Sequence, residues 1–244
     1  MRHAYGPADD VPQMIRGASS EDQAERKEAI NNLFGTIWHQ GTVYEATAPA
    51  VPFIARVARM PGLSPLDRGL LVALLAGIAG GHSYIEVQAD VHRGLGHPLD
   101  ESVLSTEVLH VRNANRAVTA EAPALLAGLA GIHRGIDWRL AQLANQADVV
   151  MTPGLAELFE TLARSTDNAA LLAALRLARA RADGSVSAAM LEEAETIDHS
   201  FDDDQFSEFD LITETSDGLD VRTRAQWLAN DLFEFGFGET GLAW

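Results

Sequence analysis

The sequence predicts an all-α protein built from pairs of helices, and three observations support this. Apolar residues recur with a helical period along most of the 244 residues. Serine, threonine or aspartate precedes several of these apolar stretches, as is typical of helix starts. No stretch alternates apolar and polar residues between hairpin turns, as half-buried strands do. A chain of this length can bury a core, as one domain or as two small ones.

The first two predicted helices flank residues 38–53, WHQGTVYEATAPAVPF. Ser20 followed by Glu21 and Gln23 is a start signal of the capping-box type, so the first helix is expected to begin there. Gly41 suits its end, because only glycine takes the left-handed conformation without strain. One face of this helix carries five apolar residues: Ile30, Leu33, Phe34, Ile37 and Trp38.

The second helix is expected to begin at Thr47. Pro49 is tolerable in its first turn, whereas Pro52 should kink the helix or delay its beginning. Its inward face carries Val51, Ile54, Val57 and Ala58. A third start lies at residues 64–67, SPLD, which supply a serine cap, a proline at the first helical position and a carboxylate. The apolar face that follows comprises Leu66, Leu70, Leu74, Leu75 and Ile78.

Helix pairs recur further along the chain. They are expected at residues 102–117 with 119–131, 137–149 with 152–164, and 168–182 with 187–197. Asp137, Thr152 with Pro153, and Asp167 mark three of the starts. A last helix at residues 221–235 has an apolar face of Val221, Ala225, Leu228, Leu232 and Phe235.

Two of these segments are similar to each other. TAPAVPFIARVA from Thr47 and TAEAPALLAGLA from Thr119 share a threonine, alanines and apolar spacing. Their offset is 72 residues, or two units of 36, and Thr152 opens another such helix 33 residues later. A period of this size predicts a solenoid, in which each helix pair buries its apolar face against its neighbours.

The segment NLFGTIWHQGTVYEATAPAVPFIARVA, followed by a leucine-rich helix with a Ser-Pro start, resembles the first repeat of bacterial HEAT-like repeat proteins. In these a short joint of the HQGT type links the two helices of a pair. The likeness is specific for residues 21–80 and looser to residue 182. It implies a HEAT-like helical-repeat solenoid, an α-α superhelix whose concave face binds another macromolecule, and it implies no reaction. Residues 1–190 are then the HEAT-like repeats, and residues 191–244 an acidic C-terminal helical cap continuous with the solenoid.

The charge of the chain is strongly negative and unevenly distributed. Eighteen basic residues against 35 acidic ones give a formal net charge of −17. Residues 191–244 hold 15 acidic and 2 basic residues, a net charge of −13, and residues 1–190 carry the remaining −4. Such a field repels phosphate backbones, so a nucleic-acid partner is not expected. It attracts a basic protein and speeds the encounter with it.

The composition also bears on the compartment. There is no cysteine, which excludes disulfides and thiolate metal sites and fits a reducing environment. The N-terminal residues lack the apolar region of a secretory signal, and the longest apolar run, residues 70–79, is too short to span a bilayer. We therefore expect a cytoplasmic protein with no membrane partner.

Residues 38–53 allow two interpretations. As a structural joint, Trp38 and Tyr44 pack beneath the turn, and His39 lies at the negative end of a helix. As a catalytic loop, His39 and Glu45 would form an acid/base pair. The joint is favoured because no nucleophile or oxyanion site accompanies the pair.

A second histidine-containing segment precedes the middle of the chain. Residues 82–99 are expected to hold a degenerate second helix of the second repeat unit and a long loop. Imidazole and carboxylate groups there could bind zinc or a harder cation. Their spacing matches no established metal signature, so a polar loop without metal or other cofactor is favoured. The groups concerned are His82, Glu86, Asp90, His92 and His97.

The acidic segment IDHSFDDDQFSEFDLITETSDGLD interleaves phenylalanines with carboxylates. It is either a solvated connection whose phenylalanines pack on the last helices, or a surface whose aromatic residues and carboxylates hold a basic protein. The candidate partner-binding residues are Asp202, Asp203, Asp204, Phe206, Glu208, Phe209 and Asp210, together with Tyr44 and Glu45.

These observations predict a non-catalytic protein-binding solenoid with an acidic face. Its most concrete form is an immunity or inhibitor protein that neutralises a basic toxin or nuclease. No Walker loop, dinucleotide fingerprint or nucleophile elbow is present in the sequence, which argues against the corresponding enzymes. The alternatives are an enzyme or small-ligand protein that uses the concave groove, and an assembly scaffold.

Overall fold

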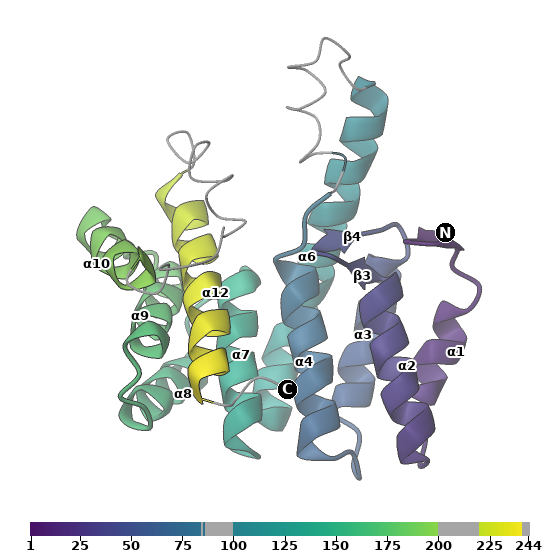
Figure 1. The fold of residues 1–244 in the computed structure, drawn as a ribbon, viewed down its shortest axis with the longest axis horizontal. Coiled ribbons are helices and arrows are strands. Elements are labelled where there is room, and N and C mark those ends of the chain that lie inside the picture. The colour runs from purple at the N-terminus through teal and green to yellow at the C-terminus, as the bar shows by residue number, and fades with distance from the viewer. Residues whose placement is uncertain (84, 86–99, 200–219, 241–244) are drawn as a thin grey trace. The chain divides into compact units, whose positions relative to one another are not determined.

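Most of the described residues lie in helices, which confirms the predicted all-α class (Figure 1). The computed structural model describes residues 1–83, 85, 100–199 and 220–240. The chain divides into two compact units, Met1–Leu143 and Ala144–Trp244. None of the described helices combines the length and the apolar character needed to cross a membrane.

Unit 1 contains a bundle of helices with two very short antiparallel hairpins at one end. Within it α1 packs on α2, and α3 packs on α4 and α6. The helices are α1 (Val11–Gly17), α2 (Gln23–Thr36), α3 (Thr47–Ala58), α4 (Pro65–Ala79), α6 (Glu101–Leu129) and the first ten residues of α7 (Arg134–Gln146). The hairpins are β1 (Arg2–His3) with β2 (Gly6–Pro7), and β3 (Trp38–His39) with β4 (Thr42–Val43).

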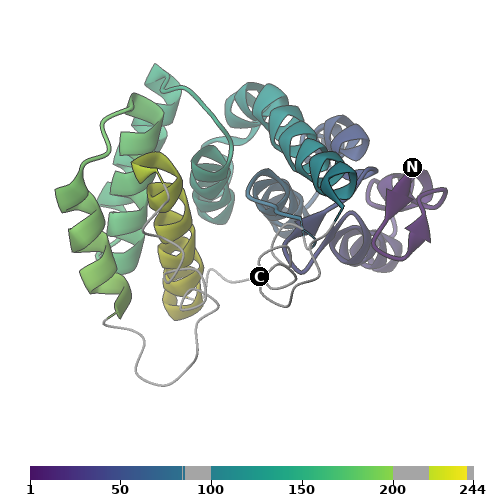
Figure 2. The ribbon, with the colours of Figure 1, turned by 90° about the horizontal axis from the view of Figure 1, so that it is seen from above.

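Unit 2 contains the end of α7 and the helices α8 (Pro153–Arg164), α9 (Ala169–Asp183), α10 (Ala188–His199) and α12 (Val221–Thr240). Helix α12 lies along α9, and α10 packs against both (Figure 2). Residues far apart in the sequence, those of α9 and those of α12, therefore share one core.

The predicted helix starts are confirmed where a capping side chain precedes a proline. Ser64 accepts the Asp67 N–H at the start of α4, and Thr152 accepts the Leu155 N–H at the start of α8. Helix α3 begins at Thr47 as predicted, and Pro52 lies inside it without delaying its beginning.

Other predicted starts are wrong by one to three residues, because a neighbouring side chain makes the bond. Helix α2 is capped by Asp22, and Ser20 donates to the Glu25 carboxylate instead. Helix α9 is capped by Asn168 and not by Asp167. Helix α7 begins at Arg134, and Asp137 accepts the Gly131 N–H from the preceding turn at 2.7 Å.

The predicted pair at residues 102–117 and 119–131 is instead one helix, α6, of 29 residues. Thr119 does not start a helix: its hydroxyl donates to Asn115 Oδ1 at 3.4 Å within α6. No helix-breaking residue precedes it, and Pro123 is accommodated inside the helix. The two segments that resemble each other in sequence thus correspond to a helix start at Thr47 and a helix middle at Thr119, which removes one support for a regular repeat.

The predicted apolar face of the last helix is confirmed in part: Ala225, Leu228 and Leu232 are fully buried, whereas Val221 is 48% exposed. Phe233 and Phe237, which were not predicted, are also fully buried and stack with their ring centroids 5.8 Å apart. At Gly236 a Cβ atom would lie 2.5 Å from Leu171 Cγ. A side chain at this position would prevent the close contact of α12 with α9. The apolar residues of α12 that are buried are Ala225, Leu228, Ala229, Leu232, Phe233 and Phe237.

Candidate functional site

The predicted partner-binding residues fall in two places. Tyr44 and Glu45 lie in unit 1, between β4 and α3. The other seven lie outside the described residues: Asp202, Asp203, Asp204, Phe206, Glu208, Phe209 and Asp210.

The candidate metal ligands cannot be assembled from the described part of the chain. His82 is described, whereas Glu86, Asp90, His92 and His97 are outside it. Within residues 1–83, 85, 100–199 and 220–240, no three His, Asp or Glu side chains are arranged to hold a metal ion.

The joint between α2 and α3 is a β-hairpin. Trp38 pairs with Val43 and His39 with Thr42. Gln40 and Gly41 form the turn, with φ of 50° and 81°. Two consecutive positive φ angles are typical of the tight turns that match the twist of paired strands. Gly41 therefore takes the left-handed conformation that was predicted, but in a hairpin turn and not at the end of a helix.

Hydrogen bonds fix this hairpin to the helices beside it. The buried Thr47 hydroxyl donates to the Ile37 carbonyl and accepts the Tyr44 N–H at 2.8 Å. His82 adds a backbone pair: its N–H donates to the Gly41 carbonyl at 2.9 Å, and its carbonyl accepts the Val43 N–H at 3.1 Å. The position of Tyr44 is thus determined by the residue that follows α2 on one side and by His82, three residues after the end of α4, on the other.

Glu45 bonds to the N-terminal hairpin. Its carboxylate accepts the Arg2 N–H at 3.0 Å and lies 3.8 Å from the N-terminal ammonium group of Met1. No hydrogen bond joins Glu45 to His39, whose ring instead contacts Tyr5 with centroids 5.5 Å apart. The arrangement of these described residues supports the structural joint and does not support an acid/base pair.

An aromatic and acidic cluster lies beside this joint, and we call Tyr5, His39, Tyr44 and Glu107 the hairpin-end cluster. Burial, together with the nearby Tyr5 and Glu107, raises the pKa of Tyr44, so its phenol stays neutral and can donate a hydrogen bond. Glu107, on α6, accepts a hydrogen bond at 3.1 Å from the hydroxyl of the fully buried Ser83. The cluster contains three aromatic rings, two of them phenols, and one carboxylate.

Sequence patterns alone indicated only part of this cluster. Tyr5 precedes Gly6 and Pro7, and a Gly-Pro pair is a turn signal that could have placed an aromatic residue at a turn. Glu107 carries no such signal, because one glutamate on a long helix is usually a solvated residue. Only the tertiary fold brings α6 to the hairpin.

In unit 2 a second group of carboxylates lies where α10 meets α12. Burial, and then the negative charges of Asp198 and Glu234, raise the pKa of Asp231 to about 7. Nearby, Arg224 of α12 pairs with Glu195 of α10, and Arg176 of α9 pairs with Glu193 at 2.6 Å. Carboxylates and arginines of α9, α10 and α12 thus lie close together in this part of unit 2.

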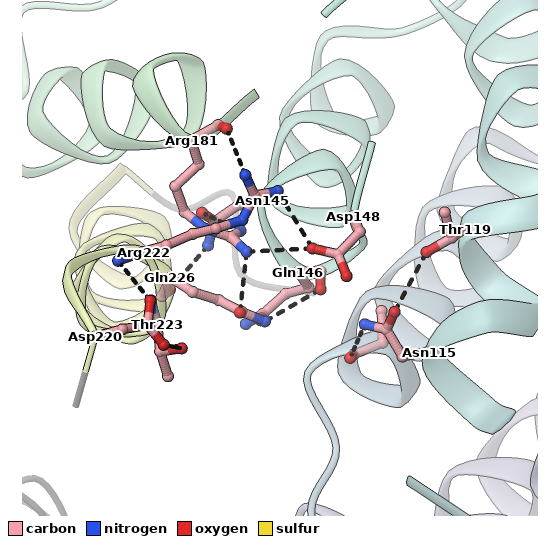
Figure 3. A network of polar contacts seen from close by, with 11 residues as sticks. Asn115, Thr119, Asn145, Gln146, Asp148, Arg181, Asp220, Arg222, Thr223 and Gln226 are labelled. Atoms are coloured by element: carbon pink, nitrogen blue, oxygen red, sulfur yellow. Dashed lines mark hydrogen bonds and ion pairs between the residues drawn. The ribbon is translucent and has the colours of Figure 1, made fainter. Parts of the chain in front are cut away.

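A buried arginine links three helices of unit 2 (Figure 3). Arg181 of α9 is 4% exposed and donates to Asn145 Oδ1 at 3.3 Å and to Gln226 Oε1 at 3.0 Å. Burial, and then the nearby Arg222, lower its pKa to about 10, so the guanidinium remains charged at neutral pH. Asp148 lies 3.9 Å from Arg181 and 3.3 Å from Arg222. These contacts lie within unit 2 and indicate a structural role, although the buried Nε atom of Arg181 has no hydrogen-bond partner among the described residues.

A shallow hollow between α9 and α10 has an empty volume of about 210 Å³, part of which is open solvent. The Arg176–Glu193 ion pair is part of its wall. Small-molecule sites are usually larger and more enclosed, so we do not assign a ligand to it.

Comparison with known proteins gives no match: no protein-family model, curated protein or solved structure matches this chain. The resemblance of residues 21–80 to HEAT-like repeat proteins therefore stays a prediction.

Proposed function

We propose that this protein is a non-catalytic binding protein of the immunity or inhibitor type, which uses a negatively charged surface to hold a basic protein such as a toxin or nuclease. The observation that carries the proposal is the concentration of charge: residues 191–244 have a net charge of −13 out of −17. A surface of this kind increases the local concentration of a cationic partner and accelerates association.

The described part of this region supports the proposal. Asp198, Asp231 and Glu234 lie near one another where α10 meets α12, and burial, followed by the charges of Asp198 and Glu234, raises the pKa of Asp231. A basic partner placed against α10 and α12 would relieve this repulsion. That gain is available only in the complex, and it therefore favours binding.

The helical frame suits such a role. Helices α9, α10 and α12 pack on one another around a core of fully buried side chains, so the carboxylates that they carry project from a rigid surface. Rigid surfaces lose little conformational entropy on binding. In the solenoid version of the proposal, HEAT-like pairs in residues 1–190 supply a concave binding face.

The experiment begins with capture of the partner. Tagged protein is incubated at low salt with lysate of the source organism, and the retained protein is identified by mass spectrometry and then produced alone. The triple variant Asp202→Asn, Asp203→Asn, Asp204→Asn is compared with a matched control, Asp9→Asn, Glu21→Gln, Glu28→Gln, which makes the same charge change at exposed positions of unit 1.

We expect a partner with a strongly basic surface. The triple variant should weaken its binding by about tenfold or more, and the control by much less. Equal dissociation constants for the two variants, or a captured partner without a basic surface, would overturn the proposal.

A further inference from the structure

Tyr5 is an exposed aromatic residue in a fixed position. It lies in the turn between β1 and β2, and its residue is 69% exposed. Hydrogen bonds hold the chain just before Tyr5: Ala4 N–H donates to the Thr36 carbonyl at 3.1 Å, and Ala46 N–H donates to the Arg2 carbonyl at 3.0 Å. Exposed aromatic residues that are already ordered contribute most to binding, because little entropy is lost when they make contact.

A second tyrosine and a carboxylate lie next to it. Tyr44 is partly buried, and it follows Val43, whose N–H donates to the His82 carbonyl. Ser83, the next residue, donates to Glu107, so Glu107 is near this end of β4. On the paired strand, the ring of His39 contacts Tyr5. The three groups come from separate elements, since Tyr5 belongs to the N-terminal hairpin, Tyr44 follows β4 and Glu107 belongs to α6. All three lie within unit 1.

Glu107 is partly buried, and no arginine, lysine or histidine among the described residues forms an ion pair with it. Among the described residues, the hydroxyl of Ser83 is its hydrogen-bond donor. A carboxylate accepts about four hydrogen bonds, so Glu107 keeps capacity for an external donor. Desolvation without a cation costs free energy, and a bound cation would recover it.

We propose that Tyr5, Tyr44 and Glu107 form a binding site for a guanidinium group, which an arginine side chain of the partner supplies. The planar guanidinium stacks on aromatic faces and donates two parallel hydrogen bonds to one carboxylate. A lysine ammonium group has no flat face to stack and binds this arrangement less well. This site rests on the proposed function, because the arginine belongs to the basic protein partner.

The site can be tested without the partner. N-acetyl-arginine amide is titrated into the full chain labelled with nitrogen-15, and backbone amide shifts are followed by NMR. N-acetyl-citrulline amide, which has the same shape and no charge, is the matched probe, and N-acetyl-lysine amide tests the preference for a planar group. We expect the arginine probe to shift the amides of Tyr5, Tyr44 and Ser83 with a dissociation constant roughly in the millimolar range.

Two pairs of variants locate the site. Glu107→Gln keeps an acceptor for Ser83 but removes the charge, and it should lower the affinity for the arginine probe at least fivefold. Glu101→Gln, at an exposed position of the same helix, should leave this affinity unchanged. Tyr5→Ala should lower the affinity for the arginine probe at least threefold, whereas Tyr5→Phe should keep the affinity of the natural protein.

Equal binding of arginine and citrulline probes would overturn the site, as would equal effects of the two glutamate variants. Shifts confined to α10 and α12 would do the same. These results are independent of the wider proposal: loss of the partner with the Asp202, Asp203, Asp204 variant alone would support acidic binding even if no arginine site exists at the hairpin-end cluster.

Discussion

Asp231 is a carboxyl group whose pKa in the folded protein, about 7, lies well above its ordinary value of 3.8. Burial disfavours its charged form, and Asp198 and Glu234 add repulsion. The folded state therefore binds a proton that the unfolded state has already released between about pH 4 and pH 7. Over this interval the free energy of unfolding falls as the pH rises, and above pH 7 the loss is complete.

Asp231→Asn should remove this contribution to the pH dependence of the free energy of unfolding. We expect the variant to be more stable than the natural protein at pH 8, by about 1 to 3 kcal/mol, and nearly unchanged at pH 4. Urea unfolding followed by circular dichroism at several pH values measures this. Glu157→Gln, at an exposed position of α8, is the control. An unaltered difference in stability between pH 4 and pH 8 in Asp231→Asn would contradict the assignment.

Arg181 provides a second test with single substitutions. Arg181→Ala leaves Asn145 and Gln226 without their donor in a buried site, and we expect it to lower the free energy of unfolding by about 3 kcal/mol. Arg179→Ala removes an arginine of the same helix that is 45% exposed and pairs with Glu160 and Asp183. Exposed pairs contribute little, so its effect should stay below about 1 kcal/mol. Similar losses for the two variants in urea unfolding would argue against a buried structural role for Arg181.

Among the helices, the contact of α9 with α12 depends on a residue without a side chain. Gly236→Ala would improve helix propensity but place a Cβ atom against the fully buried Leu171. We expect a net destabilisation of about 1 to 3 kcal/mol. Gly154→Ala is the matched change in unit 2, because nothing lies within 4 Å of a Cβ atom there. It should be neutral or slightly stabilising; a stabilising Gly236→Ala would mean that α9 and α12 are packed less closely.

The elements that sequence patterns predicted correctly are those whose signals are local. The starts at Ser64 and Thr152 depend on a side chain and a backbone N–H three residues later, and both were confirmed. The continuity of α6 depends on packing, and the predicted helix start at Thr119 was wrong. The face of α12 was predicted in part, because the burial of Phe233 and Phe237 also depends on packing. The hairpins β1–β2 and β3–β4 were missed because strands of two residues are too short to show alternation.

The candidate site shows the same difference between residues with a local sequence signal and residues placed only by packing. Tyr44 and Glu45 stood out because they interrupt a sequence rich in alanine and leucine. Tyr5 and Glu107 join them only through the packing of the N-terminal hairpin and α6, which no local pattern encodes. The pKa of Asp231 likewise depends on α10 and α12 meeting.

For the molecule as a whole, the uneven charge is the property from which function is inferred. Long-range attraction between opposite charges increases association rates, and dissolved salt screens it over about 10 Å at 0.1 M. Binding driven by contact area alone would not respond to salt in this way. The dependence of the association rate on ionic strength therefore distinguishes binding driven by charge from binding driven by contact area.

The most direct test is the association rate constant with the captured partner, measured by stopped flow between 20 mM and 300 mM salt. We predict that the rate constant of the natural protein falls about tenfold or more over this range, and that neutralising Asp202, Asp203 and Asp204 together flattens the dependence. The control with Asp9, Glu21 and Glu28 neutralised should retain most of it. A rate constant that does not change with salt, or equal slopes for the two variants, would contradict the central claim that negative charge near the C-terminal end recruits a basic protein.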